Sequence, residues 1–186
     1  MKRSIRNLSV WAAVLAGAWA CTSAGADPTA LAIIESRSDS KVTGKAIFTQ
    51  LSNGKTRVEV TISGATPGMH GLHVHDKGDC SAPDAASAGG HFNAAGNPHA
   101  APTDAKRHNG DLGNIEIGPD GKGKLTIETD MLTVTEGPNS VVGKSVLFHE
   151  KADDMKTQPT GNAGARYGCG VVVLTPTGNA NAQKVR

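Results

Sequence analysis

The sequence predicts an all-β protein, in which about eight short antiparallel strands form a sandwich or flattened barrel with two long functional loops. Short segments rich in β-branched residues recur along the chain, with turn residues between them. No segment shows the sustained 3.6-residue period of an amphipathic helix. Glycine supplies 23 of the 186 residues, about 12% against an average of roughly 7%, which is typical of a chain with many turns.

Eight segments carry the strand signals. The third alternates cleanly and places Val58, Val60 and Ile62 on one face, as expected for a half-buried strand. Asn-Gly at 53–54 predicts a tight hairpin before it, and Asp-Gly at 120–121 predicts a second hairpin. In chain order, the expected strands are 30–34, 45–51, 56–62, 71–75, 114–117, 124–128, 141–149 and 170–175.

The start of the chain has the pattern of a secretory signal peptide. Lys2, Arg3 and Arg6 precede an uncharged apolar run, 8–20. That run has 13 residues, too few to span a bilayer, which needs about 20. Small residues follow it, as at a cleavage site, so the sequence predicts a signal peptide over 1–26.

Two sites compete for cleavage. Cleavage after Ala26 leaves 27–186 as a single domain, within the usual domain size of roughly 100–200 residues. Cleavage after Ala20 instead makes Cys21 the first residue and a candidate for a lipid anchor. An uncleaved membrane-anchoring helix is a third alternative. Export to the periplasm or beyond the cell is expected, and there a cysteine pair can persist as a disulfide.

Charge and aromatic content exclude some classes of partner. The chain has 19 basic and 17 acidic residues, spread without a block of like charge, so no nucleic-acid partner is expected. Aromatic residues make up only 3%, too few for a platform that stacks bases or sugars. Removing 1–26, which holds three basic residues and no acidic one, changes the formal charge from +2 to −1.

The two long loops, expected at 76–113 and 150–169, hold or adjoin all seven histidines. Loops this long inside a compact domain are usually functional or disordered. His73 and His75 are two apart on an expected strand, so their imidazoles project from the same face. Neutral imidazole binds copper or zinc well. Alone, this pair is also typical of structural or surface histidines.

The first loop adds three further imidazoles and a carboxylate. Three histidines and one aspartate are a ligand set that zinc takes in closed tetrahedral sites. A solvated histidine-bearing loop is the alternative. His149 ends an apolar strand, where a buried, satisfied histidine would be the default in isolation. The candidate zinc ligands are His91, His99, His108 and Asp111.

Several separate motifs surround these candidate ligands. They are Gly71-Leu72-His73-Val74-His75, His91-Phe92-Asn93, His108-Asn109-Gly110-Asp111-Leu112-Gly113-Asn114, His149-Glu150-Lys151-Ala152-Asp153-Asp154 and Gly161-Asn162-Ala163-Gly164-Ala165-Arg166. Together they resemble the copper/zinc superoxide dismutase family. The resemblance covers nearly the whole chain after residue 26, and an exported bacterial-type member is the expectation. The spacing of 8, 9 and 3 residues from His91 to Asp111 also fits the family pattern.

The resemblance implies an immunoglobulin-like Greek-key fold that binds one copper and one zinc per subunit. The implied reaction is dismutation of superoxide to dioxygen and hydrogen peroxide by alternating reduction and oxidation of copper. Copper would be bridged to zinc through His91, which also takes up a proton, and the reaction would serve antioxidant defence outside the cytoplasm. The implied copper ligands are His73, His75, His91 and His149, and the implied zinc ligands are His91, His99, His108 and Asp111.

The resemblance also assigns roles around the metals. Asp153 would hydrogen-bond one ligand of each metal, Arg166 would guide superoxide, and Thr160 would narrow the same channel. Cys80 and Cys169 would form the disulfide of the family. His70 has no metal role in this pattern and is expected to pack or hydrogen-bond beneath the copper strand.

The sequence departs from the family in ways that leave some properties open. The segment from His149 to Arg166 is shorter than in eukaryotic members and lacks their Glu/Lys-rich stretch, so Lys77 and Lys151 are substitute candidates for steering superoxide. Dimer contacts differ between bacterial and eukaryotic members, so homodimer and monomer both stay open. A catalytically silent metal-binding relative and a purely structural sandwich domain are the competing classes.

Overall fold

A computed structural model describes residues 27–176; the predicted signal peptide, including Cys21, lies outside the described residues, as does 177–186. The described part contains eight strands and one short 3₁₀ helix, η1, so the predicted all-β fold is confirmed. None of its helices is long and apolar enough to cross a membrane. The elements are β1 (Thr29–Ser36), β2 (Thr43–Gln50), β3 (Thr56–Ser63), β4 (Gly68–His75), η1 (Ala86–Ala88), β5 (Asp111–Ile117), β6 (Lys122–Thr129), β7 (Ser145–His149) and β8 (Arg166–Leu174).

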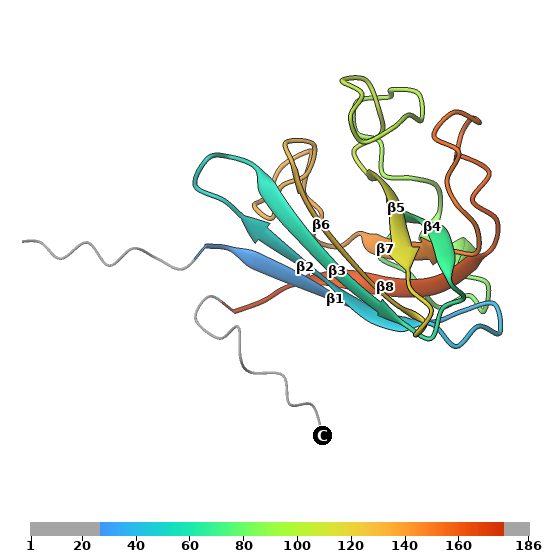
Figure 1. The fold of residues 1–186 in the computed structure, drawn as a ribbon. Coiled ribbons are helices and arrows are strands. Elements are labelled where there is room, and N and C mark those ends of the chain that lie inside the picture. Colours follow the sequence, from blue (N-terminus) through green and yellow to red (C-terminus); the bar gives the residue numbers. More distant parts are fainter. Residues whose placement is uncertain (1–26, 177–186) are drawn as a thin grey trace, which may run out of the picture.

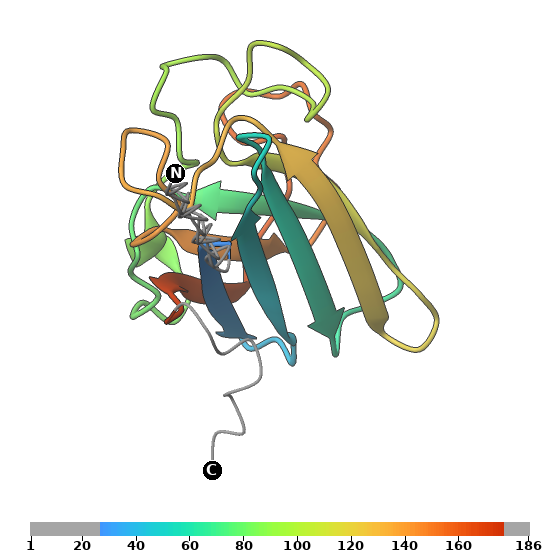
Figure 2. The same cartoon turned by 90° about the vertical axis from the view of Figure 1, so that its left-hand side faces the viewer.

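The strands form one antiparallel sheet that is curled into a nearly closed barrel (Figures 1 and 2). Their order is β5-β4-β7-β8-β1-β2-β3-β6, so the chain crosses the barrel between β3 and β4 and again between β6 and β7. These two crossovers give the Greek-key topology. The outermost strands, β5 and β6, are joined by a hairpin in which Gly118 N–H donates to the Lys122 carbonyl at 2.8 Å. That hairpin brings the two ends of the sheet together.

Alternation along the strands builds the core. Val58, Val60 and Ile62 on β3 are all buried, as the period-two pattern predicts. Phe48 and Phe148 are the largest fully buried side chains and pack in the same cluster. A barrel filled by interdigitated apolar side chains is a rigid support, because core packing leaves little room for adjustment.

Some strand ends differ from the prediction. The predicted strand 141–149 starts only at Ser145, because residues 141–144 form a turn in which Lys144 N–H donates to the Val141 carbonyl at 3.0 Å. β8 starts at Arg166, four residues earlier than predicted, because its glycines obscure the alternation expected of a strand. The register shifts between Phe148 and His149 and again between Gly71 and His73. Irregularities of this kind re-aim side chains, and both lie beside candidate metal ligands.

Two long loops gather at one end of the barrel (Figures 1 and 2): the first long loop, 76–110, and the second long loop, 150–165. The first loop folds back along β4, where Phe92 N–H donates to the Val74 carbonyl at 2.8 Å and Val74 N–H to the Gly110 carbonyl at 2.9 Å. A side chain at Gly110 would place its Cβ 2.1 Å from the Val74 oxygen. Only glycine therefore allows this approach.

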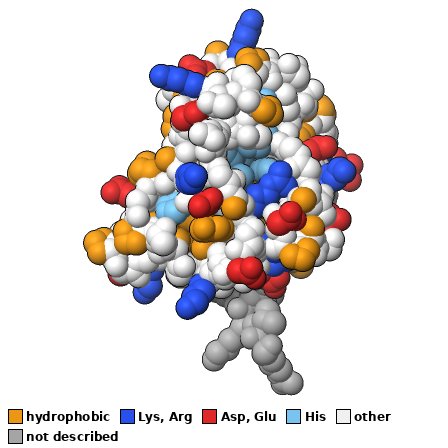
Figure 3. Space-filling view, turned by 90° about the vertical axis from the view of Figure 1, so that its right-hand side faces the viewer, with side chains coloured by type: hydrophobic (Ala, Val, Ile, Leu, Met, Phe, Trp, Pro, Cys, Tyr) orange, Lys and Arg blue, Asp and Glu red, His pale blue; other side chains and the backbone are white. Residues whose placement is uncertain are grey.

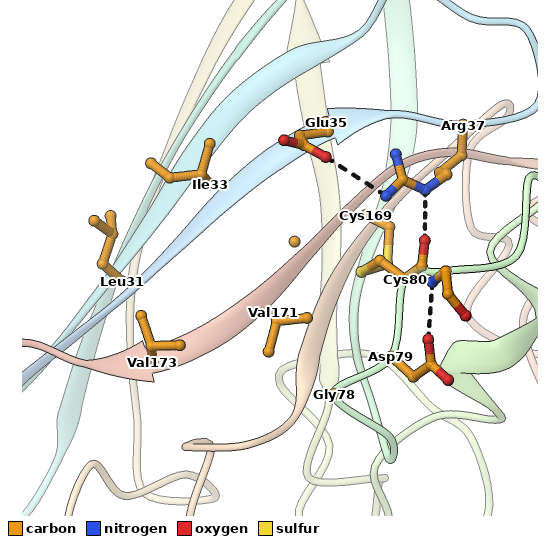
Figure 4. Close-up of a pocket in the computed structure, with 12 residues that line it drawn as sticks. Leu31, Ile33, Glu35, Arg37, Gly78, Asp79, Cys80, Cys169, Val171 and Val173 are labelled. Atoms are coloured by element: carbon orange, nitrogen blue, oxygen red, sulfur yellow. Dashed lines mark hydrogen bonds and ion pairs between the residues drawn. A yellow bond between two sulfur atoms is a disulfide. The ribbon is translucent and has the colours of Figure 1, made fainter. Parts of the chain in front are cut away.

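The predicted disulfide between Cys80 and Cys169 is present, with 5.8 Å between the Cα atoms. It ties the first long loop to β8 (Figure 4). Arg37, which follows β1, donates from Nε to the Cys80 carbonyl at 2.8 Å and approaches Glu35 at 3.6 Å. The loop is thus fastened to the barrel covalently and by a charged side chain.

Candidate metal centre

Four histidines from separate parts of the chain converge at the loop end of the barrel. His73 and His75 lie on β4, His149 ends β7, and His91 lies on the first long loop. One ring nitrogen of each lies within 4.8 Å of the others. The four nitrogens that carry no hydrogen-bond partner are His73 Nδ1, His75 Nε2, His91 Nε2 and His149 Nε2.

Unpaired buried nitrogens are costly, because each has lost its water without gaining a partner. Four of them facing one another at a buried point form a site for a cation that imidazole binds, such as copper or zinc. The residues present therefore fit a metal.

The opposite nitrogens of three of these rings are fixed by acceptors. His75 Nδ1–H donates to the Gly89 carbonyl at 2.9 Å, and His73 Nε2 faces the Asp153 carboxylate at 2.8 Å. His149 Nδ1 lies 3.4 Å from the Gly164 carbonyl. Such contacts fix the tautomer and the ring orientation of a metal-binding histidine. They leave the inward nitrogens free of protons.

A second cluster lies beside the first and contains one carboxylate. Asp111 Oδ1 lies 2.9 Å from His91 Nδ1, 3.0 Å from His99 Nδ1 and 3.4 Å from His108 Nδ1. The Nδ1 atoms of His91 and His108 are 3.4 Å apart. Four ligands placed about 2.0–2.2 Å from one zinc ion would lie roughly 3.3–3.6 Å from one another. The separations of 2.9–3.4 Å are equal to these edges or slightly shorter, so the four groups are close enough to share one ion.

His91 belongs to both clusters. Its Nδ1 faces Asp111 in the second cluster, while its Nε2 is the unpaired nitrogen in the first. Two nitrogens on opposite sides of one ring can bind two cations only if both have lost their protons, and two adjacent cations favour that state. The geometry therefore places one imidazole between two candidate metal sites.

Asp153 connects the clusters a second time. Its Oδ2 lies 2.8 Å from His73 Nε2 and its Oδ1 lies 3.0 Å from His99 Nε2. The backbone of Asp153 is held by the side-chain amide of Asn114, with Asp153 N–H donating to Oδ1 at 2.7 Å and Nδ2 donating to the Asp153 carbonyl at 2.9 Å. One carboxylate thus orients a ring in each cluster.

Burial favours the neutral form of the first cluster. Burial, with the nearby rings of His91 and His149, holds the pKa of His73 well below 6.5, and His75 is shifted in the same way. Burial, again with His91 nearby, lowers the pKa of His149 to about 4. These rings are therefore neutral at pH 7, which is the form that binds a metal ion.

In the second cluster, the carboxylates outweigh burial in setting the pKa values. Burial alone would lower the pKa of His99, but Asp153 and Asp111 outweigh it and raise that pKa. Burial would raise the pKa of Asp111, but hydrogen bonds from His91 and from the Ala100 N–H outweigh it and lower that pKa. The carboxylate of Asp111 is thus ionised and supplies negative charge to the cluster.

Arg166 lies beside the first cluster. The half-buried guanidinium donates from Nη1 to the Ala85 carbonyl and from Nη2 to the Gly89 carbonyl, both at 2.7 Å. Its charge is close enough to lower the pKa of His75 and of His149, after burial and the neighbouring imidazoles. Figure 3 shows histidine side chains in a hollow of this face with a basic side chain next to them.

The remaining predicted residues differ in their exposure. Thr160 is half-buried, while Lys77 and Lys151 are exposed. His70 is buried outside both clusters; its ring stacks on Phe148 at 4.8 Å, and Nδ1 lies 2.9 Å from the His149 carbonyl. His70 therefore contacts the backbone of a residue of the first cluster but belongs to neither cluster.

The fold and the site together define a class of protein: an all-β protein with two candidate transition-metal sites that share one histidine. The copper/zinc superoxide dismutase (SODC) family profile matches residues 42–172. Superoxide dismutase [Cu-Zn] 2 of Brassica juncea is 46% identical over 139 residues, which cover 72% of this chain and 90% of that protein. A crystal structure of the clock protein EA4 superposes with a TM-score of 0.73 at 37% identity, covering 80% of this chain and 96% of that one.

The chain belongs to the copper/zinc superoxide dismutase family. It is an oxidoreductase that dismutates superoxide and uses copper and zinc.

Proposed function

We propose that the four-histidine cluster holds copper, that the three-histidine, one-aspartate cluster holds zinc, and that His91 bridges them. The observation that carries this assignment is the placement of His91, whose two ring nitrogens face different clusters. Four imidazole nitrogen ligands suit copper, and a closed tetrahedral set with one carboxylate suits zinc.

Copper bound there would supply one-electron chemistry, oxidising one superoxide to dioxygen and reducing a second to hydrogen peroxide, which also requires two protons. The protein supplies the geometry for both halves. His73, His75 and His149 are held neutral and oriented, so they do not need to lose protons before they bind the metal. His91 Nε2 is the ring nitrogen that can accept a proton when it is not bound to copper, and it faces the cluster where that proton is needed.

Arg166 is proposed to guide the anionic substrate. Its guanidinium stays charged at neutral pH and lies next to the copper cluster, since it shares the Gly89 carbonyl with His75. The formal charge of residues 27–186 is −1, so attraction for superoxide must come from local placement of positive charge. Lys77 and Lys151 are exposed at the same end and are secondary candidates.

We also propose export, to the periplasm or beyond the cell, with antioxidant defence as the role. The signal pattern of 1–26 motivates this proposal. The disulfide between Cys80 and Cys169 supports it, because disulfides persist in oxidising compartments. Cleavage at Ala26 would give a free domain, and cleavage at Ala20 would allow a lipid anchor on Cys21.

One preparation tests both proposals: the full chain is expressed, the cells are fractionated, and the exported protein is purified. We expect one copper and one zinc per chain, superoxide dismutation, and a mass that shows loss of 1–20 or 1–26. His91→Ala should lose activity and the 1:1 stoichiometry. His70→Gln, which alters the one histidine outside both clusters, should keep the stoichiometry.

The outcomes separate the proposals. Full metal loading without activity would make the protein a metal-binding module. Unchanged metal content in His91→Ala would exclude the bridge. An intact N-terminus in a cytoplasmic fraction would exclude export while leaving the metal assignment standing.

A further inference from the structure

The side chain of Gln158 clamps the backbone of His99. His99 N–H donates to Gln158 Oε1 at 2.8 Å, and Gln158 Nε2 donates to the His99 carbonyl at 2.7 Å. The two residues are 59 positions apart, on the two long loops. His99 is only 2% exposed and lies in a stretch without a strand, so Gln158 supplies the partners that β-pairing would otherwise supply to this peptide.

The same loop also orients the ring of His99. Asp153, from the second long loop, faces His99 Nε2 at 3.0 Å, and this places Nδ1 3.0 Å from Asp111. Gln158 fixes the peptide and Asp153 fixes the ring, so the second long loop determines both the position and the direction of one ligand. The His99 backbone and the Asp153 backbone are each held by a side-chain amide through two bonds, the latter by Asn114.

We propose that Gln158 is a positioning residue for the zinc site, which slows zinc release by holding the His99 peptide in its ligating orientation. The proposal rests on the ligand set proposed above. Without the clamp, both backbone groups of His99 lose their partners, and the peptide can rotate and carry Nδ1 away from Asp111. Copper should be little affected, because His99 is outside the copper cluster and Asp153 still holds His73.

The position of Gln158 makes the proposal testable. The residue is exposed, so its replacement removes both bonds to His99, and the longer one to the Lys156 carbonyl, without opening the core. Lys156 offers a matched control, since it is exposed on the same loop and its side chain makes no hydrogen bond to Gln158. Only the Lys156 backbone carbonyl bonds to Gln158, by accepting a hydrogen bond from Nε2 at 3.2 Å. Lys156→Ala changes the loop surface but keeps that carbonyl.

The experiment measures zinc and copper release from the loaded protein into excess chelator, for wild type, Gln158→Ala, Gln158→Glu and Lys156→Ala. Loss of a group that orients a ligand weakens metal binding by roughly 10–100-fold, and we expect zinc release about tenfold faster in Gln158→Ala. Gln158→Glu keeps the acceptor and loses the donor, so it should lie between Gln158→Ala and wild type. Lys156→Ala should match wild type, and copper release should not change.

Cobalt(II) bound at the zinc site adds a readout that a general loss of stability would not move. Its visible spectrum should shift in Gln158→Ala, because one ligand is less well aligned. Equal zinc release in Gln158→Ala and wild type would overturn the proposal, as would equal acceleration for copper and zinc. His99→Ala separates the two proposals: unchanged zinc binding in that variant would overturn the ligand set itself.

Discussion

Single groups in the site, one carbonyl and one carboxylate, each hold two functional side chains. The Gly89 carbonyl accepts from His75 Nδ1 at 2.9 Å and from Arg166 Nη2 at 2.7 Å. Asp153 likewise orients His73 and His99. Because these partners are shared, a small displacement of the Gly89 peptide would alter one candidate ligand together with Arg166. A displacement of the Asp153 carboxylate would alter one ring in each cluster, so a residue that does not itself bind a metal should affect both metals.

Gly161 provides the sharpest residue-level test. A Cβ at this position would lie 1.8 Å from Asp153 Oδ1 and 2.7 Å from His99 Nε2. Gly161→Ala should therefore push Asp153 off both rings and weaken copper and zinc binding, each by roughly 10–100-fold, as measured by chelator competition. Gly96→Ala is the control, because Gly96 has φ +67 against +69 at Gly161 but has nothing within 4 Å of the added Cβ.

The control separates contact from backbone strain. Both glycines have a left-handed φ, so alanine is strained at each. Equal weakening in the two variants would show that strain alone is responsible, and the steric role of Gly161 would be rejected.

At the scale of elements, the strands could be predicted from sequence and the loop contacts could not. Alternation reveals β3 because each residue faces either the core or the solvent. The candidate ligands were predicted because several motifs together resemble one family, whereas a pair such as His73 and His75 alone is also typical of structural histidines. Gln158 carries no such signal, since an exposed glutamine in a loop has no typical partner. The Gly89 carbonyl belongs to the backbone, so residue type says nothing about it.

The disulfide gives an element-level prediction. Cys80 packs against a small cluster with Ala85, Ala88, Leu147 and Cys169, and the carbonyls of Ala85 and Gly89 that hold Arg166 follow it on the same loop. The sequence separation of 89 residues corresponds to about 4–5 kcal/mol on the chain-entropy model, and measured losses are typically 2–5 kcal/mol.

The double variant Cys80→Ser/Cys169→Ser should therefore lose an amount of unfolding free energy in that range and unfold at a lower denaturant concentration. Its activity should also depend less on ionic strength, because Arg166 is no longer held beside the copper cluster. Denaturant unfolding and initial rates at several salt concentrations measure the two effects. A stability loss with an unchanged salt dependence would mean that the loop holds Arg166 without the disulfide.

At the scale of the whole molecule, the barrel holds several imidazoles in a neutral form that water would not favour at low pH. Burial, and after it the neighbouring imidazoles, lowers the pKa of His73 and of His75. Burial also lowers the pKa of His149 to about 4 and lowers the pKa of His108. His99 is shifted the other way, so four lowered groups oppose one raised group. Without metals, the net lowering of these histidine pKa values makes the stability of the whole fold depend on pH.

The sign follows from proton counting. In the unfolded chain these histidines take up protons as the pH falls through about 6.5, whereas in the metal-free folded state His149 stays neutral until about 4. The unfolded state therefore binds more protons between these values, and the free energy of unfolding falls as the pH falls. His99 acts oppositely, since its raised pKa adds stability that is lost as the pH rises through it.

Metal-free protein with its disulfide intact should thus lose stability steadily from pH 6.5 to pH 4, with about 3 kcal/mol from His149 alone. Denaturant unfolding across this range measures the slope. His149→Asn should show a shallower slope than wild type, because the variant has removed one buried group that the folded state keeps neutral. A flat profile in the metal-free wild type would show that water reaches the four-histidine cluster, so that burial does not set the protonation of its rings.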